Sequence, residues 1–210
     1  MVFHLVTAAY SWNGRKSDCT KSKHNHSPKW RFGSYSRSET VTMNIINATK
    51  WPMTNPRCYA HGGVIVVQPS EISSGCKEMM VMRKRYRLPT GSYGTVSWDI
   101  NGKQVIVMWS APFNFDFYSN TLAVGIAEHY GNNHSKSSFH EMYNEDKDYF
   151  TREEYRNSTR NIVKTVDGFI CVHGSMSTTQ KPVVEILVSP FIDRDLASGL
   201  YGPPPSYSRD

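Results

Sequence analysis

Residues 92–109 read SYGTVSWDINGKQVIVMW, and this stretch decides the fold class. It contains two short segments with the composition of strands, Ser92–Asp99 and Lys103–Trp109, and Asn101-Gly102 lies between them. An Asn-Gly pair in this position is the signal of a two-residue hairpin turn, because both residues accept a left-handed backbone. We therefore expect an antiparallel β-hairpin.

Short segments of the same kind lie on both sides of this hairpin. Val41, Met43 and Ile45 alternate with polar side chains, which is the period of a half-buried strand. The other segments that we expect to be strands are Gly63–Gln68, Met80–Tyr86, Leu122–Ala127, Asn161–Val166, Phe169–His173 and Val183–Ser189. About nine short strands with closely spaced turn signals indicate an antiparallel β-sandwich or barrel.

One segment has a helical period instead. Within residues 136–147, Phe139, Met142 and Tyr143 stand at positions i, i+3 and i+4, which places them on one face of a helix. His140-Glu141 is interpreted as the solvated face of this helix, and Glu153-Glu154 as part of a loop.

The two ends of the chain differ from its middle. Residues 1–40 carry seven Lys or Arg against two acidic residues, so they hold most of the formal net charge of +6. We expect a basic, largely irregular arm at 1–38, a folded domain at 39–190 and an extended tail with three adjacent prolines at 191–210. The arm is expected to attract anionic surfaces, and a solvated tail without a specific partner is the alternative.

Several function classes find no support in the sequence. It has no apolar run of about 18 residues, no nucleotide-binding or hydrolase motif and no Cys-x-x-Cys pair, so we expect neither a membrane-spanning helix nor an enzyme, a cofactor or a metal site. The folded part adds no basic face for nucleic acid. The beginning of the chain is a poor signal peptide, whereas sequons at Asn47, Asn133 and Asn157 favour secretion. Cys58 and Cys76 are close enough in sequence to bridge neighbouring strands, and their pairing stays open.

The most unusual segment is residues 109–122, which read WSAPFNFDFYSNTL. Four aromatic residues, Phe113, Phe115, Phe117 and Tyr118, stand among proline, asparagine and aspartate. Rings in such a polar loop are difficult to bury and partition well into a membrane–water interface. The alternative is that they close one end of the sandwich.

Residues 107–126, VMWSAPFNFDFYSNTLAVGI, resemble the signature loop of the actinoporins, a family of pore-forming cytolysins. Weaker resemblances follow in the same order as in that family, and the whole similarity covers about residues 40–190. They are Asn55–Tyr59, Leu88–Val96, Phe139–Tyr143 and the segment from Gly174 to Val188.

The resemblance implies a β-sandwich flanked by one or two short helices, which recognises phosphocholine headgroups, sphingomyelin above all. Carried over by motif, the headgroup site consists of Ser110, Pro112, Tyr118, Phe139 and Tyr143. The rings of Phe113, Phe115 and Phe117 then lie in the interface. Thr121, Asn144, Gly62 and Tyr93 depart from the family pattern. The implied partners are membrane lipids, with anionic lipids for the arm, and further copies of the chain on the membrane.

The family perforates bilayers with an amphipathic N-terminal helix, which is short in this sequence. Val2, Leu5, Val6 and Ala9 share a helical face, but Trp12-Asn13-Gly14 interrupts it. Twelve helical residues span roughly 18 Å against a hydrocarbon core of about 30 Å. We therefore expect a secreted or membrane-associated lipid binder with an impaired lytic step. A non-lytic, lectin-like glycan-binding protein on the same fold is the alternative.

Overall fold

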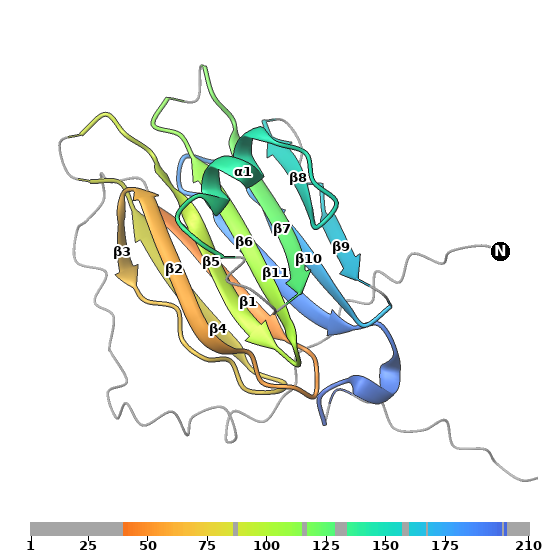
Figure 1. Ribbon diagram of the computed structural model, residues 1–210. Helices are drawn as coiled ribbons and strands as arrows, with labels where there is room; N and C mark the ends of the chain where they lie inside the picture. Colours follow the sequence, from red (N-terminus) through yellow and green to blue (C-terminus); the bar gives the residue numbers. More distant parts are fainter. Residues whose placement is uncertain are drawn as a thin grey trace, which may run out of the picture.

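In a computed structural model of the protein, the described residues are 40–85, 88–114, 117–128, 134–156, 160–166, 168–198 and 200. They form two β-sheets packed face to face (Figure 1). The strands of the first sheet are, in spatial order, β3 (Val64–Val67), β4 (Lys77–Arg83), β1 (Thr40–Asn47), β11 (Val183–Pro190), β10 (Ile170–Met176) and β9 (Ile162–Val166). Those of the second are β2 (Thr54–Gly62), β5 (Ser92–Ile100), β6 (Lys103–Ala111), β7 (Asn120–Glu128) and β8 (Phe150–Tyr155).

The predicted hairpin is confirmed and forms the centre of the second sheet. Strands β5 and β6 pair antiparallel from Ser92–Ala111 to Ile100–Lys103. Asn101 has φ 42° and Gly102 has φ 77°, so both turn residues adopt the left-handed conformation that an Asn-Gly pair tolerates. This register directs Trp98 and Trp109 into the interior, where both are completely buried.

The core lies between the inner faces of the two sheets. On β1, buried and half-buried residues alternate strictly, so that Val41, Met43 and Ile45 face the second sheet. Strands β5, β6 and β7 are buried over most of their length, because a second apolar layer covers their outer face. That layer is contributed by helix α1 (Ser138–Asn144), whose Phe139 and Met142 pack on Ile106 and Met108.

Among the described strands, one pair departs from the expected antiparallel pattern. Strands β1 and β11 run parallel, from Thr42–Val183 to Asn47–Val188, and the first and last strands of the sandwich are therefore neighbours. After β11 the chain forms the 3₁₀ turn η1 (Asp193–Asp195). Residues 191–198, which belong to the predicted tail, pack on the sandwich: Ala197 is buried, and Asp195 pairs with Lys50 at 2.6 Å.

Other expectations are corrected. The described residues form eleven strands rather than about nine, since β2 and β8 extend the second sheet at its two edges. The interpretation of Glu153-Glu154 as a loop is wrong: both residues lie in β8, paired with Leu122 and Thr121. A bridge between Cys58 and Cys76 is not formed, because Cys58 keeps a free thiol.

The sequon at Asn47 does not fit a glycosylation site. The Asn47 side chain is buried and donates to the carbonyl oxygens of Trp51 and Ile72, at 2.7 and 3.1 Å. The predictions for the arm at 1–38, for Tyr86, Phe115, Asn133 and Asn157, and for the prolines of the tail lie outside the described residues.

Candidate functional site

One end of the sandwich carries an open pocket of about 300 Å³. It lies where β5 begins and β6 ends, between the loop before β5, the loop between β6 and β7, and helix α1 (Figure 1). The residues that line it are Pro89, Thr90, Gly91, Tyr93, Ser110, Pro112, Phe113, Asn114, Tyr118 and Tyr143. We call this site the ring pocket and the end of the molecule that carries it the ring pole.

Close backbone contacts shape the ring pocket. A Cβ atom on Gly91 would lie 2.1 Å from the carbonyl oxygen of Ala111, so only glycine lets the loop before β5 approach the end of β6. Gly62 and Tyr93 pair across β2 and β5, and a Cβ atom on Gly62 would overlap the Tyr93 ring at 2.1 Å. The absent side chain of Gly62 therefore leaves the space in which the Tyr93 ring lies.

The base of the loop between β6 and β7 is fixed to the first sheet. Asn120, which is fully buried at the start of β7, donates to the carbonyl oxygens of Ser177 and Thr179, at 2.8 and 3.1 Å. Within the loop, the amide of Tyr118 donates to the carbonyl oxygen of Asn114 at 3.2 Å. These bonds hold the loop where it leaves the sandwich, while the side chains of Phe113, Phe117 and Tyr118 stay outside.

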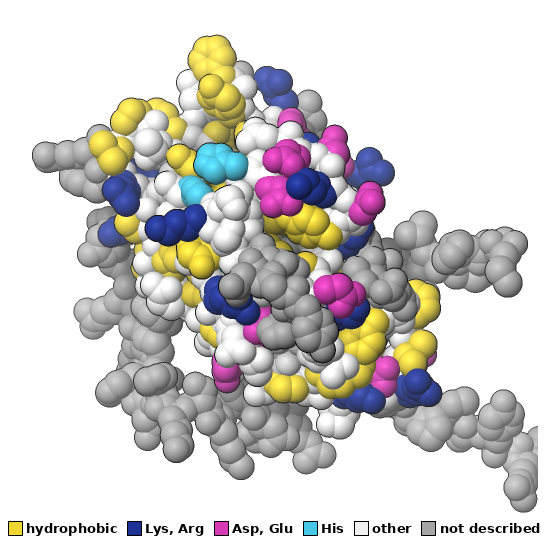
Figure 2. All heavy atoms as spheres, in the orientation of Figure 1, with side chains coloured by type: hydrophobic (Ala, Val, Ile, Leu, Met, Phe, Trp, Pro, Cys, Tyr) yellow, Lys and Arg dark blue, Asp and Glu magenta, His cyan; other side chains and the backbone are white. Residues whose placement is uncertain are grey.

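The described rings of this loop face solvent. Phe113, Phe117 and Tyr118 are 43%, 77% and 62% exposed. Figure 2 shows hydrophobic side chains projecting at the end of the molecule where Figure 1 places this loop. A cluster of exposed rings is typical of a surface that a membrane or another molecule covers, so that the rings lose their contact with water. For the described rings, this agrees with the expectation of an exposed aromatic cluster.

Helix α1 contributes the opposite wall of the ring pocket. Tyr143 is half-buried and stacks on Phe139, with 5.5 Å between the ring centroids and 18° between the planes. Phe139 is only 6% exposed and also contacts Tyr93, at 5.1 Å between centroids. Phe139 therefore supports two rings of the pocket from behind, and it does not line the pocket itself.

The lining of the ring pocket contains aromatic rings, several hydroxyl groups and one amide but no charged side chain. Four rings, those of Tyr93, Phe113, Tyr118 and Tyr143, surround the position of Ser110. The face of an aromatic ring attracts a cation, and Phe113 already has one: the Lys84 ammonium lies 4.4 Å from its centroid. Aromatic faces beside hydroxyl and amide groups suit a ligand that carries a cationic group next to hydrogen-bonding atoms.

The predicted site residues come together to a large extent. Ser110, Pro112, Tyr118 and Tyr143 all line the ring pocket, and so does Phe113, which was expected in the interface. Phe139 lies behind the wall, Phe117 projects outside the pocket, and Phe115 lies outside the described residues.

Sequence reasoning assigned no role to one side of the pocket. Pro89, Thr90 and Gly91 form it, together with Asn114, whereas Tyr93 stands at a pocket position where the sequence departs from the family pattern. The signal was present in the Leu88–Val96 motif, whose glycines mark a close approach of the backbone. The predicted hairpin places Ser92 of this motif opposite Ala111, next to the loop between β6 and β7, but the sequence did not show that the residues before Ser92 turn towards that loop.

A second pocket, of about 440 Å³, lies at the opposite pole, near η1. Trp51 and Phe169 form an aromatic wall, with 4.8 Å between their centroids. Lys50 lies 5.0 Å from the Trp51 centroid and pairs with Asp195. Unlike the ring pocket, this site thus places charged groups of both signs next to aromatic rings.

Two further findings concern the described part of the chain. It contains no group of three or more metal-ligating side chains. None of its helices is long and apolar enough to span a bilayer.

Comparison with known proteins places this arrangement in context. A family model described as sea anemone cytotoxic protein matches residues 30–189. Echotoxin-2 of Monoplex parthenopeus is 33% identical over 190 residues, which cover 78% of this chain and 62% of that protein. Tereporin-Ca1 of Terebra anilis is 40% identical over 92 residues, which cover 42% of this chain and 48% of that protein.

Among solved structures, the lipid binding protein Nakanori has the same fold. Its TM-score is 0.59 at 19% sequence identity, and the match covers 74% of this chain and 73% of that chain. The matched region of Echotoxin-2 corresponds to 62% of that protein's length, and that of Tereporin-Ca1 to 48%. The chain thus spans about half to three-fifths of the curated relatives.

Proposed function

The chain belongs to the sea anemone cytotoxic protein family, whose model covers residues 30–189, and on this basis we propose that it is a pore-forming, cytolysin-like protein that binds membrane lipids. The family is one of toxins and not of enzymes, in agreement with the lack of a catalytic motif in the sequence. The proposed ligand is the phosphocholine headgroup, with sphingomyelin as the preferred lipid.

One observation carries this proposal: the uncharged ring pocket opens beside exposed aromatic side chains at the same pole. Quaternary ammonium is a cation without a hydrogen-bond donor, so the faces of aromatic rings are its best partners. Tyr93, Tyr118 and Tyr143 provide such faces, whereas the Phe113 ring already contacts the Lys84 ammonium. The hydroxyl groups of Ser110 and Tyr118 can donate to the phosphate oxygens.

The exposed rings explain how the pocket would reach its ligand. Phe113, Phe117 and Tyr118 lie beside the pocket mouth and would enter the interfacial region when a headgroup is bound. The basic arm would add attraction to anionic lipids, and bound copies would then associate on the membrane. Secretion follows from the same proposal, because such a protein acts on the outer surface of its target.

Vesicle flotation tests the proposal. The wild-type chain is expected to float with vesicles of phosphatidylcholine and sphingomyelin, and more weakly with vesicles of phosphatidylethanolamine and phosphatidylglycerol, which attract only the basic arm. Tyr118→Ala removes one ring and one hydroxyl from the pocket and should reduce binding at least tenfold. Phe191→Ala is the matched control, since Phe191 is equally exposed but lies beyond β11, at the opposite pole. Undiminished binding of Tyr118→Ala would refute the pocket assignment.

Release of an entrapped dye from the same vesicles tests the lytic step. We expect weak release, because the predicted N-terminal helix is too short to cross the hydrocarbon core. A chain without residues 1–38 should release no more dye than the full chain. Strong release by the shortened chain would contradict the role given to the arm.

Glycan binding without lysis is a second candidate, and the pocket near η1 favours it. Sugar rings pack their C–H faces on aromatic side chains and bond through their hydroxyl groups to charged ones. Trp51 and Phe169 offer the rings, and the Lys50–Asp195 pair offers a donor and an acceptor. A glycan array with wild-type and Trp51→Ala chains separates the two functions, since Trp51 lies far from the ring pocket.

A further inference from the structure

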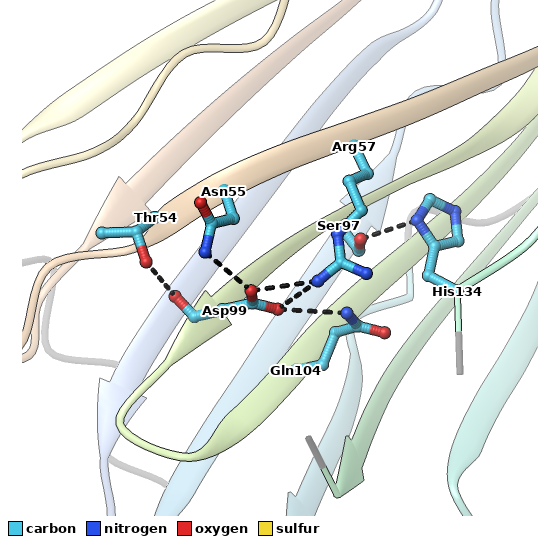
Figure 3. Close-up of polar contacts among 7 residues, drawn as sticks. All are labelled: Thr54, Asn55, Arg57, Ser97, Asp99, Gln104 and His134. Atoms are coloured by element: carbon cyan, nitrogen blue, oxygen red, sulfur yellow. Dashed lines mark hydrogen bonds and ion pairs between the residues drawn. The ribbon is translucent and has the colours of Figure 1, made fainter. Parts of the chain in front are cut away.

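Two histidines fix the segment 134–144, which includes α1, to the second sheet. His134 belongs to this segment and His61 to strand β2 of the sheet. From the segment, His134 inserts between two hydroxyl groups of β5 and is only 3% exposed; Figure 3 shows its contact with one of them, Ser97. Its Nδ1 lies 2.6 Å from Ser97 Oγ, and its Nε2 lies 2.8 Å from Thr95 Oγ1. Its ring also makes an edge-on contact with Tyr59 of β2, at 5.0 Å.

The second histidine, His61 near the end of β2, reaches from the sheet to the segment. Its ring stacks on Phe139 at 5.1 Å and meets His140 edge-on at 5.4 Å. It also hydrogen-bonds the backbone of Lys136. Its Nε2 is buried without a partner among the described residues. When His61 is protonated, the N–H group at this nitrogen therefore finds no hydrogen-bond acceptor there.

The described charges that face the two histidines are positive. Arg57 of β2 acts on His134, and Lys136 and His140 of the segment act on His61. The nearby carboxylate of Asp99 is already held by Arg57, with N–O distances of 2.9 and 3.0 Å, and by Asn55 and Gln104 (Figure 3). Tyr59, Thr95 and Ser97 offer His134 only neutral groups.

We propose that His61 and His134 are positioning residues that hold α1, and with it Tyr143, on the second sheet while both imidazoles are neutral, so that mild acid releases the segment and opens the wall of the ring pocket. The consequence for lipid binding rests on the proposed function. The release of the segment does not.

The direction of the pH dependence follows from linkage. Burial lowers the pKa of His134 from 6.5 to about 4, and the charge of Arg57 acts in the same direction. Burial, followed by the charge of His140, also lowers the pKa of His61. A released imidazole binds a proton with its ordinary pKa, whereas the docked imidazole binds it with a lowered pKa. Docking is therefore at full strength above pH 6.5 and weakens as the pH falls from 6.5 towards 4.

The magnitude can be stated for His134 alone. With a pKa near 6.5 when released and near 4 when docked, lowering the pH from 7.5 to 5.5 shifts the equilibrium towards release about tenfold. Because α1 carries Tyr143, the same change lowers the fraction of molecules with a complete ring pocket. Phosphocholine itself does not titrate in this range, so the lipid cannot cause the effect.

Hydrogen exchange of the full chain tests the release without any lipid. After correction for the intrinsic pH dependence of exchange, peptides from 134–144 should exchange about tenfold faster at pH 5.5 than at pH 7.5. Peptides from β5 to β7 should not change. In a His61→Phe, His134→Gln double variant, which keeps a stacking ring and a hydrogen-bonding side chain, exchange should be independent of pH. Rates in the wild type that do not change with pH would overturn the proposal.

Flotation with vesicles of phosphatidylcholine and sphingomyelin at the two pH values adds the lipid. Wild-type binding should decrease at pH 5.5, by no more than the shift in the release equilibrium itself, while the double variant should bind equally at both pH values. His173→Gln is the matched control: His173 is a half-buried histidine of β10 in the other sheet, and its variant should behave like the wild type. If His173→Gln abolishes the pH effect, the proposal is wrong. If exchange responds to pH but the wild type binds no vesicle at any pH, the proposed function fails and the positioning role stands.

Discussion

Replacement of Phe117 by alanine isolates the contribution of one exposed ring to membrane docking. Phe117 is 77% exposed, so most of its surface can leave water when the ring pole meets a bilayer. Full transfer of a phenylalanine side chain contributes about 1.5–3 kcal/mol, and three-quarters of that is about 1–2 kcal/mol. Since about 1.4 kcal/mol is a factor of ten in an equilibrium constant, Phe117→Ala should weaken partitioning roughly five- to thirty-fold.

The assay is titration of the chain with vesicles of phosphatidylcholine and sphingomyelin, followed by sedimentation. Urea unfolding should show no loss of stability, because the ring makes little contact with the folded domain. Phe191→Ala removes a ring of similar exposure, 58%, at the other pole and should leave partitioning within about twofold. Equal effects of the two substitutions, or none from Phe117→Ala, would refute docking through the ring pole.

Three further predictions concern stability. Gly62→Ala forces a methyl group into the Tyr93 ring and should cost about 1–3 kcal/mol of unfolding free energy in urea titrations, with weaker vesicle binding. Asn120→Ala leaves two carbonyl oxygens at the base of the aromatic loop without their donor and should cost about 1–3 kcal/mol by the same measurement. His134 has a pKa lowered from 6.5 to about 4, so the unfolding free energy should fall by up to about 3 kcal/mol between these pH values, and the decrease should be largely absent in His134→Gln.

The fold was predictable wherever a short stretch of sequence specifies its own conformation, as a turn pair or an alternating strand does. Asn101-Gly102 specifies its turn by backbone conformation, and the alternation on β1 specifies its buried face. Strand β8 escaped prediction because it is an edge strand with one neighbour, β7, and its central residues are polar. Only Phe150 and Tyr155 at its ends are buried, which leaves too little alternation to read.

The ring pocket was predictable in part and for a different reason. Ser110, Pro112 and Tyr118 follow one another in a single loop, so their composition alone indicates an unusual surface. Tyr143 is brought to them only by the packing of α1 on the second sheet, whereas Tyr93 is placed opposite Ser110 by the predicted hairpin of β5 and β6. The burial of Phe139 also depends on this packing: a helical face identifies which residues point inward but not which of them a neighbouring strand covers.

The parallel pairing of β1 with β11 determines where the polypeptide enters the domain. Thr40, the first residue of β1, pairs with Arg83, and the next residue along β4, Lys84, reaches Phe113 of the aromatic loop. The segment that precedes Thr40 is thus tethered at the ring pole, whereas β11 delivers the chain to the far side. When the arm and the aromatic loop both attach to one membrane, each raises the effective concentration of the other at its surface, so the affinity of the two together should exceed that of either one alone.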